Sequence, residues 1–319
     1  MIEVKNLTKR YGNHLAVDHL NFTVESGKIY GFLGPNGAGK STTMNIMTGY
    51  LGATEGQVLI DGHDILKEPE EAKKNIGYLP EIPPLYMEMT VREYLEFAAE
   101  LKGIKKDKRE PQIEEVIRLA KLRDVENRLI QNLSNGYKQR VGLAQAVLGF
   151  PEIIILDEPT VGLDPKQIIE IRELIRKLAK KHTVILSSHI LAEVREVCDY
   201  IMIISGGKLV ASDTTENLEN MMSGKGQIEV EAKASRDEMD HIIRRTGKIK
   251  EVKYRTSASD ITTAQIIAKG GEDIREELFL AFSHADVPML TLNQSKTTLE
   301  EIFLELTQGS GNRMIKEEK

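Results

Sequence analysis

The chain has 319 residues and a formal net charge of −6, from 43 lysine and arginine residues against 49 aspartate and glutamate residues. Its length predicts about two domains of ~150 residues each. The acidic balance gives no support to nucleic acid as a partner, because such binding depends on basic contacts to phosphates. The single cysteine, Cys198, excludes an internal disulfide framework and a cysteine metal cluster, and indicates a reducing compartment.

The N-terminal segment 1–5 alternates apolar and polar side chains, which predicts a first strand and not a signal peptide. Strand signals alternate with turns over residues 1–30. No apolar stretch approaches the ~18 residues needed to cross a bilayer; the run 200–204 has the length of a buried strand. If the protein serves a membrane, we expect another chain to supply the membrane spans.

Residues 34–42 match the phosphate-loop pattern G-x-x-x-x-G-K-[ST] without a mismatch. An apolar run of strand length, 28–33, precedes the loop, and a proline-free stretch follows it, as a strand–loop–helix requires. Glycines let backbone N–H groups approach a polyphosphate, and the helix N-terminus adds positive charge. The lysine can bind the outer phosphates, and the serine hydroxyl can ligate Mg²⁺. The predicted nucleotide-binding residues are Gly34, Pro35, Asn36, Gly37, Ala38, Gly39, Lys40, Ser41 and Thr42.

Strands are predicted at 56–62 and 76–80, after which the pattern changes. Thr90 and Glu93 have the spacing of a capping box, and apolar residues then recur at helical intervals, so residues 90–150 predict a helical insert. A basic segment between two of its helices is interpreted as a solvated loop, with anionic lipid or a partner as the alternative contact; it contains Lys102, Lys105, Lys106, Lys108 and Arg109.

Strands and helices alternate again after the insert. Strands are predicted at 152–157, 182–187 and 199–205, and helices at 165–180 and 190–197. The chain therefore predicts an α/β fold with a mainly parallel sheet and helices on both faces. Residues 221–226 resemble a linker. Beyond it, the order strand–helix–strand–strand–helix–strand over 227–293 predicts a ferredoxin-like α+β domain, followed by an amphipathic helix at 298–307.

Paired carboxylates follow the apolar strand 153–156. Asp157 lies at the carboxyl end of that strand, where open α/β sheets bind ligands, and could hold Mg²⁺. Glu158 could orient and deprotonate an attacking water molecule. Two solvated acids at a strand end are the simpler interpretation, but the phosphate loop favours the functional one.

Three more segments fit a nucleotide site. Ser134 is a suitable N-cap for the amphipathic helix that follows, and a capped helix N-terminus near a glycine can bind an anion. Asp164 stands in a tight turn before the next helix. His189 ends an apolar strand beside the expected phosphate site, which favours contact with a γ-phosphate over a structural role.

In this order, these motifs resemble the nucleotide-binding subunit of an ATP-binding-cassette (ABC) transporter over about residues 1–215. The resemblance implies ATP and Mg²⁺ as ligands, a phosphate-loop core with an antiparallel β subdomain, and a helical subdomain at about 90–150. Domains are expected at 1–220 and 227–319, the second regulatory or dimerising. The resemblance assigns Glu158 and His189 to catalysis, Tyr11 to adenine stacking, and Ser134, Asn135, Gly136 and Asp164 to nucleotide contact.

Two positions depart from the family pattern. Glu81 stands where the family usually has a glutamine; as a glutamate it can still ligate Mg²⁺ or orient water, but it adds negative charge beside the triphosphate. The signature reads LSNGY instead of LSGGQ, so Tyr137 replaces a glutamine, while the serine and the backbone N–H donors are retained.

The resemblance implies that two such chains, identical or closely related, sandwich ATP head to tail. It also implies a separate transmembrane permease that docks near segment 82–87 and the helical insert, and a cytoplasmic location on the inner face of the membrane. The short cassette, together with a C-terminal domain that ends in the segment 298–306, resembles exporter ATPases for drugs, lipids, polysaccharides or ions. The alternatives are a soluble cassette ATPase of translation or DNA repair, and a phosphate-loop kinase.

Overall fold

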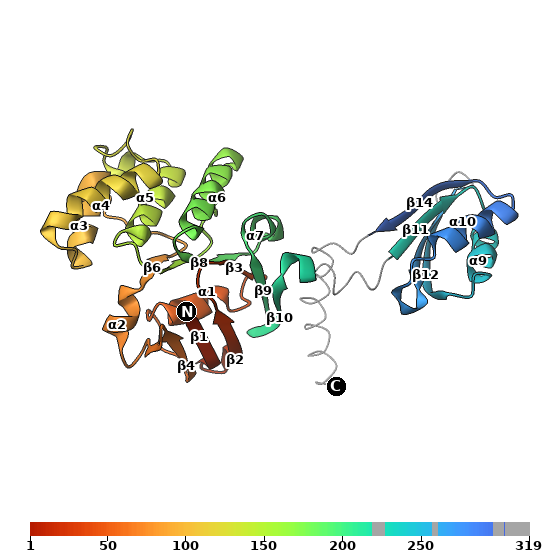
Figure 1. Ribbon diagram of the computed structural model, residues 1–319, viewed down its shortest axis with the longest axis horizontal. Helices are drawn as coiled ribbons and strands as arrows, with labels where there is room; N and C mark the ends of the chain where they lie inside the picture. Colours follow the sequence, from red (N-terminus) through yellow and green to blue (C-terminus); the bar gives the residue numbers. More distant parts are fainter. Residues whose placement is uncertain (219–226, 257–260, 296–302, 304–319) are drawn as a thin grey trace. The chain divides into compact units, whose positions relative to one another are not determined.

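The computed structural model describes residues 1–218, 227–256, 261–295 and 303. These described residues form two compact units, the first over residues 1–215 and the second over the described residues from 216 onwards (Figure 1). The predicted linker at 221–226 lies outside the described residues, as does the predicted helix at 298–307 apart from Phe303, which is helical. Within the described ranges, no helix is both long and apolar enough to span a membrane.

The first unit is built on a six-stranded sheet in the order β10-β9-β3-β8-β7-β6. Strands β3, β6, β7, β8 and β9 run parallel, and β10 is antiparallel to β9. The central strands are buried along their whole length, as is typical of a parallel sheet that is covered on both faces. The bounds are β3 Ile29–Leu33, β6 Ile76–Leu79, β7 Ile153–Leu156, β8 Thr183–Ser188, β9 Tyr200–Ser205 and β10 Lys208–Thr214. The mainly parallel sheet predicted from the sequence is confirmed.

A second, antiparallel sheet has the order β2-β1-β4-β5 and shares an apolar core with helix α1, Lys40–Met47. Its strands are β1 Ile2–Tyr11, β2 His14–Val24, β4 Glu55–Ile60 and β5 His63–Asp64, and helix α2 spans Pro69–Lys74. The core between this sheet and the parallel one fixes α1 directly after the phosphate loop.

Helices α3 Val91–Leu101, α4 Lys106–Leu119 and α5 Asn135–Val147 group into the helical subdomain (Figure 1), with a short 3-10 turn at Ile130–Asn132. The capping box of Thr90 and Glu93 is present at the start of α3. The basic segment is not wholly a loop as predicted, because α4 begins at Lys106. The amide of Lys108 donates to the carbonyl of Lys105 (2.9 Å) and closes its first turn.

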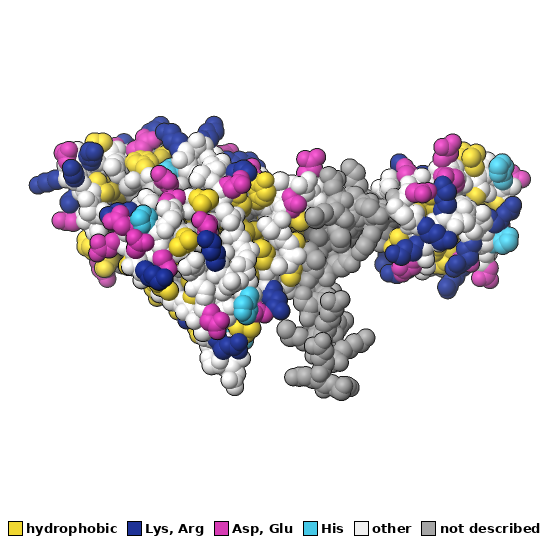
Figure 2. Space-filling view, turned by 60° about the horizontal axis from the view of Figure 1, so that its bottom comes forward, with side chains coloured by type: hydrophobic (Ala, Val, Ile, Leu, Met, Phe, Trp, Pro, Cys, Tyr) yellow, Lys and Arg dark blue, Asp and Glu magenta, His cyan; other side chains and the backbone are white. Residues whose placement is uncertain are grey.

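Helices α6 Pro165–Ala179 and α7 Leu191–Val197 complete the first unit. On the face shown in Figure 2, acidic and basic side chains are interspersed over this unit.

The second unit has the order β11 Gln227–Ala232, α9 Arg236–Arg244, β12 Ile249–Thr256, β13 Thr262–Ala268, α10 Arg275–His284 and β14 Met289–Ser295, with a 3-10 turn at Lys269–Gly271. Its antiparallel sheet has the order β12-β13-β11-β14. Alternate residues of β11 and β13, such as Val230 and Ile266, form one apolar core with Met239 of α9 and Phe282 of α10. Both helices therefore pack on one face of the sheet, and the ferredoxin-like arrangement is confirmed.

Candidate nucleotide-binding and catalytic site

A pocket of about 540 Å³ opens over the phosphate loop at the carboxyl ends of the parallel strands. Segments far apart in sequence meet there: the β1–β2 hairpin, the loop itself, the segment after β6, the turn after β7 and the residue after β8. The lining residues are Tyr11, His14, Ala16, Asn36, Gly37, Gly39, Lys40, Ser41, Thr42, Glu81, Glu158, Val161 and His189.

Two glycines give the phosphate loop its path. A Cβ on Gly34 would lie 2.3 Å from the carbonyl oxygen of Ile204, so the strand β9 leaves no room for a side chain. Gly39 has φ of 104°, a left-handed conformation that glycine adopts without steric cost, and it precedes α1 without a side-chain cap. The first N–H groups of α1 are therefore available to a bound phosphate.

Lys40 is buried, with 5% of its surface exposed. Its ammonium donates to the carbonyls of Gly34 (2.9 Å) and Pro35 (3.3 Å) and lies 3.5 Å from the carboxylate of Glu158. These contacts hold the charge at the base of the loop, where a triphosphate would meet it.

Asp157 directly follows β7 and is buried. Its Oδ1 accepts from the hydroxyls of Ser41 (3.2 Å) and Ser187 (2.5 Å), and its backbone N–H donates to the carbonyl of Leu79 (2.8 Å). A serine hydroxyl and a carboxylate close together are oxygen ligands of the kind that Mg²⁺ takes alongside nucleotide phosphates. The donor set therefore fits that ion.

Glu158 has φ of 47°, an uncommon conformation for a residue with a side chain. Its N–H donates to the hydroxyl of Ser187 (2.8 Å), which helps to hold this backbone in place. Its carboxylate lies between Lys40 and His189, whose Nδ1 is 3.0 Å from Oε2. The turn thus points a carboxylate at the space above the loop, which is the placement that a general base requires.

The two rims of the pocket differ in chemistry. Tyr11 is about half exposed, and the ammonium of Lys9 lies 5.2 Å from the centre of its ring, so one aromatic face is available for stacking. Glu81 is exposed on the opposite segment, after β6, and brings a second carboxylate into the pocket beside Glu158.

Ser134 of the signature and Asp164 of the turn before α6 do not line this pocket. Ser134 caps α5, and its hydroxyl accepts from the N–H of Tyr137. Asp164 caps α6 in a capping box with Gln167. A Cβ on Gly136 would lie 2.4 Å from the Gln167 side chain, so the two capped helix starts pack together.

Tyr137 faces the helical subdomain. Its hydroxyl donates to Asp124 (2.6 Å), and the guanidinium of Arg140 lies 5.5 Å from its ring centre. The hydroxyl bond raises the pKa of Tyr137 above its ordinary value. The aromatic ring therefore serves a local packing role at the position where the family pattern has glutamine.

A groove of about 810 Å³ and a neighbouring pocket of about 820 Å³ border the helical subdomain, sharing Lys73, Ile76 and Lys102 in their linings. The groove includes Tyr50 and Ile82, which are 82% and 83% exposed.

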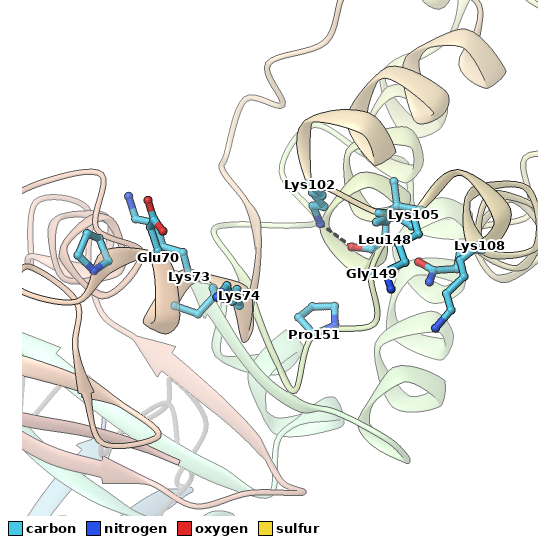
Figure 3. Close-up of a pocket in the computed structure, with 14 residues that line it drawn as sticks. Glu70, Lys73, Lys74, Lys102, Lys105, Lys108, Leu148, Gly149 and Pro151 are labelled. Carbon is cyan, nitrogen blue, oxygen red and sulfur yellow. Dashed lines mark hydrogen bonds between the residues drawn. The ribbon is translucent and has the colours of Figure 1, made fainter.

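The neighbouring pocket is lined by five lysines and one acidic residue, Glu70. Figure 3 shows Lys73 and Lys74 of α2 on one side and the α3–α4 lysines on the other; these are Lys102, Lys105 and Lys108. Lys102 donates to the carbonyls of Gln145 (2.7 Å) and Leu148 (2.6 Å) at the end of α5.

Sequence reasoning found the phosphate loop, Glu81, Glu158, His189 and Tyr11, all of which the fold brings to one pocket. It did not identify His14 in the lining, or Ser187 as the residue that binds both Asp157 and Glu158. The position of Ser187, two residues before His189, was the available signal. His14 carries no signal of its own, because it comes into the pocket only through pairing of the hairpin.

The parallel sheet, the phosphate loop and the acidic pair define a phosphate-loop NTPase. The family model described as ABC transporter matches residues 17–161. The bacitracin transport ATP-binding protein BcrA of Bacillus licheniformis is 43% identical over 221 residues, which cover 69% of this chain and 71% of that protein. The linearmycin resistance ATP-binding protein LnrL of Bacillus subtilis (strain 168) is 31% identical and matches 96% of this chain and 98% of its own length.

Among solved structures, the chain is similar to the dimeric post-hydrolysis state of the ATP-binding cassette MJ0796 bound to ADP and Pi, and the two sequences are 28% identical. The match has a TM-score of 0.62 and covers 67% of this chain and 98% of that one. The chain belongs to the ATP-binding proteins of ABC transporters. It is an ATPase that acts as the ATP-hydrolysing subunit of such a transporter, and the alternative of a soluble ATPase in translation or repair is not supported.

Proposed function

We propose that the chain drives an exporter, and that two nucleotide-binding chains, identical or closely related, form each complete ATP site. One observation carries the two-chain site: the pocket gathers the phosphate loop, Glu158 and His189, while Ser134 and Asp164 start helices that do not line it. A second chain in head-to-tail orientation would supply its Ser134 helix start to the γ-phosphate. The dimeric cassette structure supports this pairing.

Within the site, the residues have separate roles. Lys40 and the first N–H groups of α1 bind the outer phosphates, and Tyr11 stacks on the adenine. Ser41 and Asp157 would hold Mg²⁺, and Glu81 could supply a further oxygen ligand; the ion would neutralise charge on the phosphates. Glu158 orients and deprotonates the attacking water, and His189 stays within reach of both Glu158 and the γ-phosphate.

The hydrolysis step needs positive charge around the phosphate oxygens. Lys40 provides this charge as a buried cation. The N-terminus of α1 and the N-terminus of the second chain's helix at Ser134 provide it as fixed dipoles. Loss of the γ-phosphate removes the ligand that both chains share, so the pair separates and transmits the motion to a permease.

The part of the groove formed by Tyr50 and Ile82 is the proposed permease docking surface. Ser41, Asp157 and Glu81 line the same groove and belong to the proposed Mg²⁺ site instead. The exposed Tyr50 and Ile82 offer apolar contact, and the adjoining lysine pocket offers positive charge. A docking segment with an apolar stretch and acidic residues at one end fits both. Docking there would place the chain in the cytoplasm, peripheral to the inner face of the membrane. The second unit would add dimer contacts or regulation.

The names of BcrA and LnrL connect those relatives to bacitracin transport and linearmycin resistance, which supports export of a drug-like compound here. The two-chain site is tested by measuring specific ATPase activity against protein concentration, with light scattering on the same samples. We expect activity per chain to rise as dimers form. Full activity per chain in samples that remain monomeric would overturn the proposal.

Docking is tested separately by co-purification with the permease from detergent-solubilised membranes. Lys105→Glu combined with Lys108→Glu should reduce recovery of the complex. Lys180→Glu combined with Lys181→Glu, at the end of α6, changes charge equally and should not. Equal recovery of both double variants would remove the lysine pocket from the docking surface.

A further inference from the structure

A buried carboxylate outside the nucleotide pocket connects the two segments that carry the catalytic side chains. Glu193 lies on α7 with 6% of its surface exposed. Its Oε2 accepts from the hydroxyls of Thr160 (2.6 Å) and Ser188 (3.1 Å), both of which are buried. A single oxygen atom therefore links the turn after β7 to the end of β8.

Each hydroxyl stands close in sequence to a catalytic residue. Thr160 is two residues after Glu158, and Ser188 directly precedes His189. The Ser188 hydroxyl also accepts from the N–H of Ile190 (3.0 Å), so it bonds on both sides of the histidine. These bonds therefore lie in the backbone segments that carry Glu158 and His189, the two residues to which the proposed function gives catalytic roles. Nδ1 of His189 is 3.0 Å from Oε2 of Glu158.

A third segment reaches the same carboxylate. The guanidinium of Arg172, on α6, lies 3.9 Å from Oε1 of Glu193 and also pairs with Glu196. Helix α6 is the helix that Asp164 caps. Glu193 is thus in contact with the turn after β7, the end of β8 and helix α6.

We propose that Glu193 is a positioning residue for ATP hydrolysis, which holds Glu158 and His189 at their working separation through Thr160 and Ser188. A buried carboxylate costs free energy unless hydrogen bonds and charge partners compensate for it. Here both hydroxyl partners come from the two catalytic segments. Because a displacement of about 1 Å in a catalytic group can cost ~10²-fold in rate, this link can control turnover without contacting nucleotide.

The proposal predicts a specific kinetic pattern for Glu193→Ala. Its kcat should fall by about 10- to 100-fold, while the KM for ATP stays within about twofold, because Lys40 and the phosphate loop are untouched. Glu193→Gln should keep kcat within about threefold of the parent, since the amide oxygen can still accept from both hydroxyls. A role limited to fold stability would lower the Tm of the alanine variant but would leave the kcat of the folded protein unchanged.

Two further variants remove the hydroxyl groups that donate to Glu193, and leave Glu193 itself in place. Thr160→Val and Ser188→Ala each remove one hydroxyl, so each should lower kcat with little change in KM. When either change is combined with Glu193→Ala, kcat should fall little further, because Glu193→Ala already removes the hydrogen bond to that hydroxyl. These variants also keep the test available if Glu193→Ala does not fold, as judged by thermal unfolding.

Glu196→Ala is the matched control on the same helix. It removes the other carboxylate partner of Arg172 but leaves both hydroxyl bonds to Glu193 intact, so kcat should stay near the parent value. The proposal is overturned if Glu193→Ala and Glu196→Ala have the same kcat, if the loss is in KM alone, or if the Gln variant is as impaired as the Ala variant.

Discussion

The replacement Glu158→Gln tests the catalytic centre with the smallest change in shape. Glutamine keeps the size of the side chain and can still bond to His189, so the turn and its left-handed backbone should persist. It removes the negative charge 3.5 Å from the Lys40 ammonium, but that ammonium retains its two carbonyl acceptors. ATP binding should therefore remain.

The expected loss is in hydrolysis. An amide cannot take a proton from water, and a general base contributes ~10²–10⁴-fold to a rate. This range corresponds to about 2.7–5.4 kcal/mol of activation free energy.

The assay is phosphate release at saturating ATP, together with nucleotide affinity by calorimetry on the same preparation. Turnover within a few-fold of the parent, with binding unchanged, would show that another group activates the water. A parallel loss of binding and turnover would show that Glu158 acts through Lys40 instead.

Three further predictions follow from the site and the helical subdomain. Lys40→Ala should abolish tight ATP binding, and unchanged affinity by calorimetry would contradict the phosphate assignment. Ser134→Arg should block hydrolysis while a single chain still binds ATP; full turnover would argue against the two-chain site. Hydrogen bonds from Arg123 and Arg92 lower the pKa of Glu114 from 4.5 to about 2, so this carboxylate stabilises the fold above pH 4.5 and loses its effect as the pH falls to 2. Glu114→Gln should therefore lower the Tm at pH 7, with a deficit that shrinks over that interval; a constant deficit would refute the linkage.

Much of the fold could be predicted from local pattern. Short apolar runs bounded by glycines and polar residues give the strands of the first unit, and the strand at 182–187 differs from β8 by one residue. The capping box at Thr90 and the helical spacing after it give α3. These signals work because propensity, capping and apolar periodicity are properties of neighbouring residues. The start of α4 was not predicted because its clustered basic side chains indicate a solvated loop, whereas the structure closes a turn at Lys105–Lys108.

The sequence by itself determined which residues can do chemistry: a phosphate loop, an acidic pair at the end of a strand, and a histidine at the end of another. Only the tertiary structure decided which of them meet and what holds them there. Strands β3, β7 and β8 are neighbours in the sheet although about 120 residues separate β3 from β7, and their common carboxyl edge brings Lys40, Glu158 and His189 together. Glu193 has no recognisable signal in the sequence, because its role depends on hydroxyls that reach it through folding. From the sequence, a carboxylate on a short helix is expected to face solvent. In the structure, the packing of α7 buries it against β8 and the turn after β7.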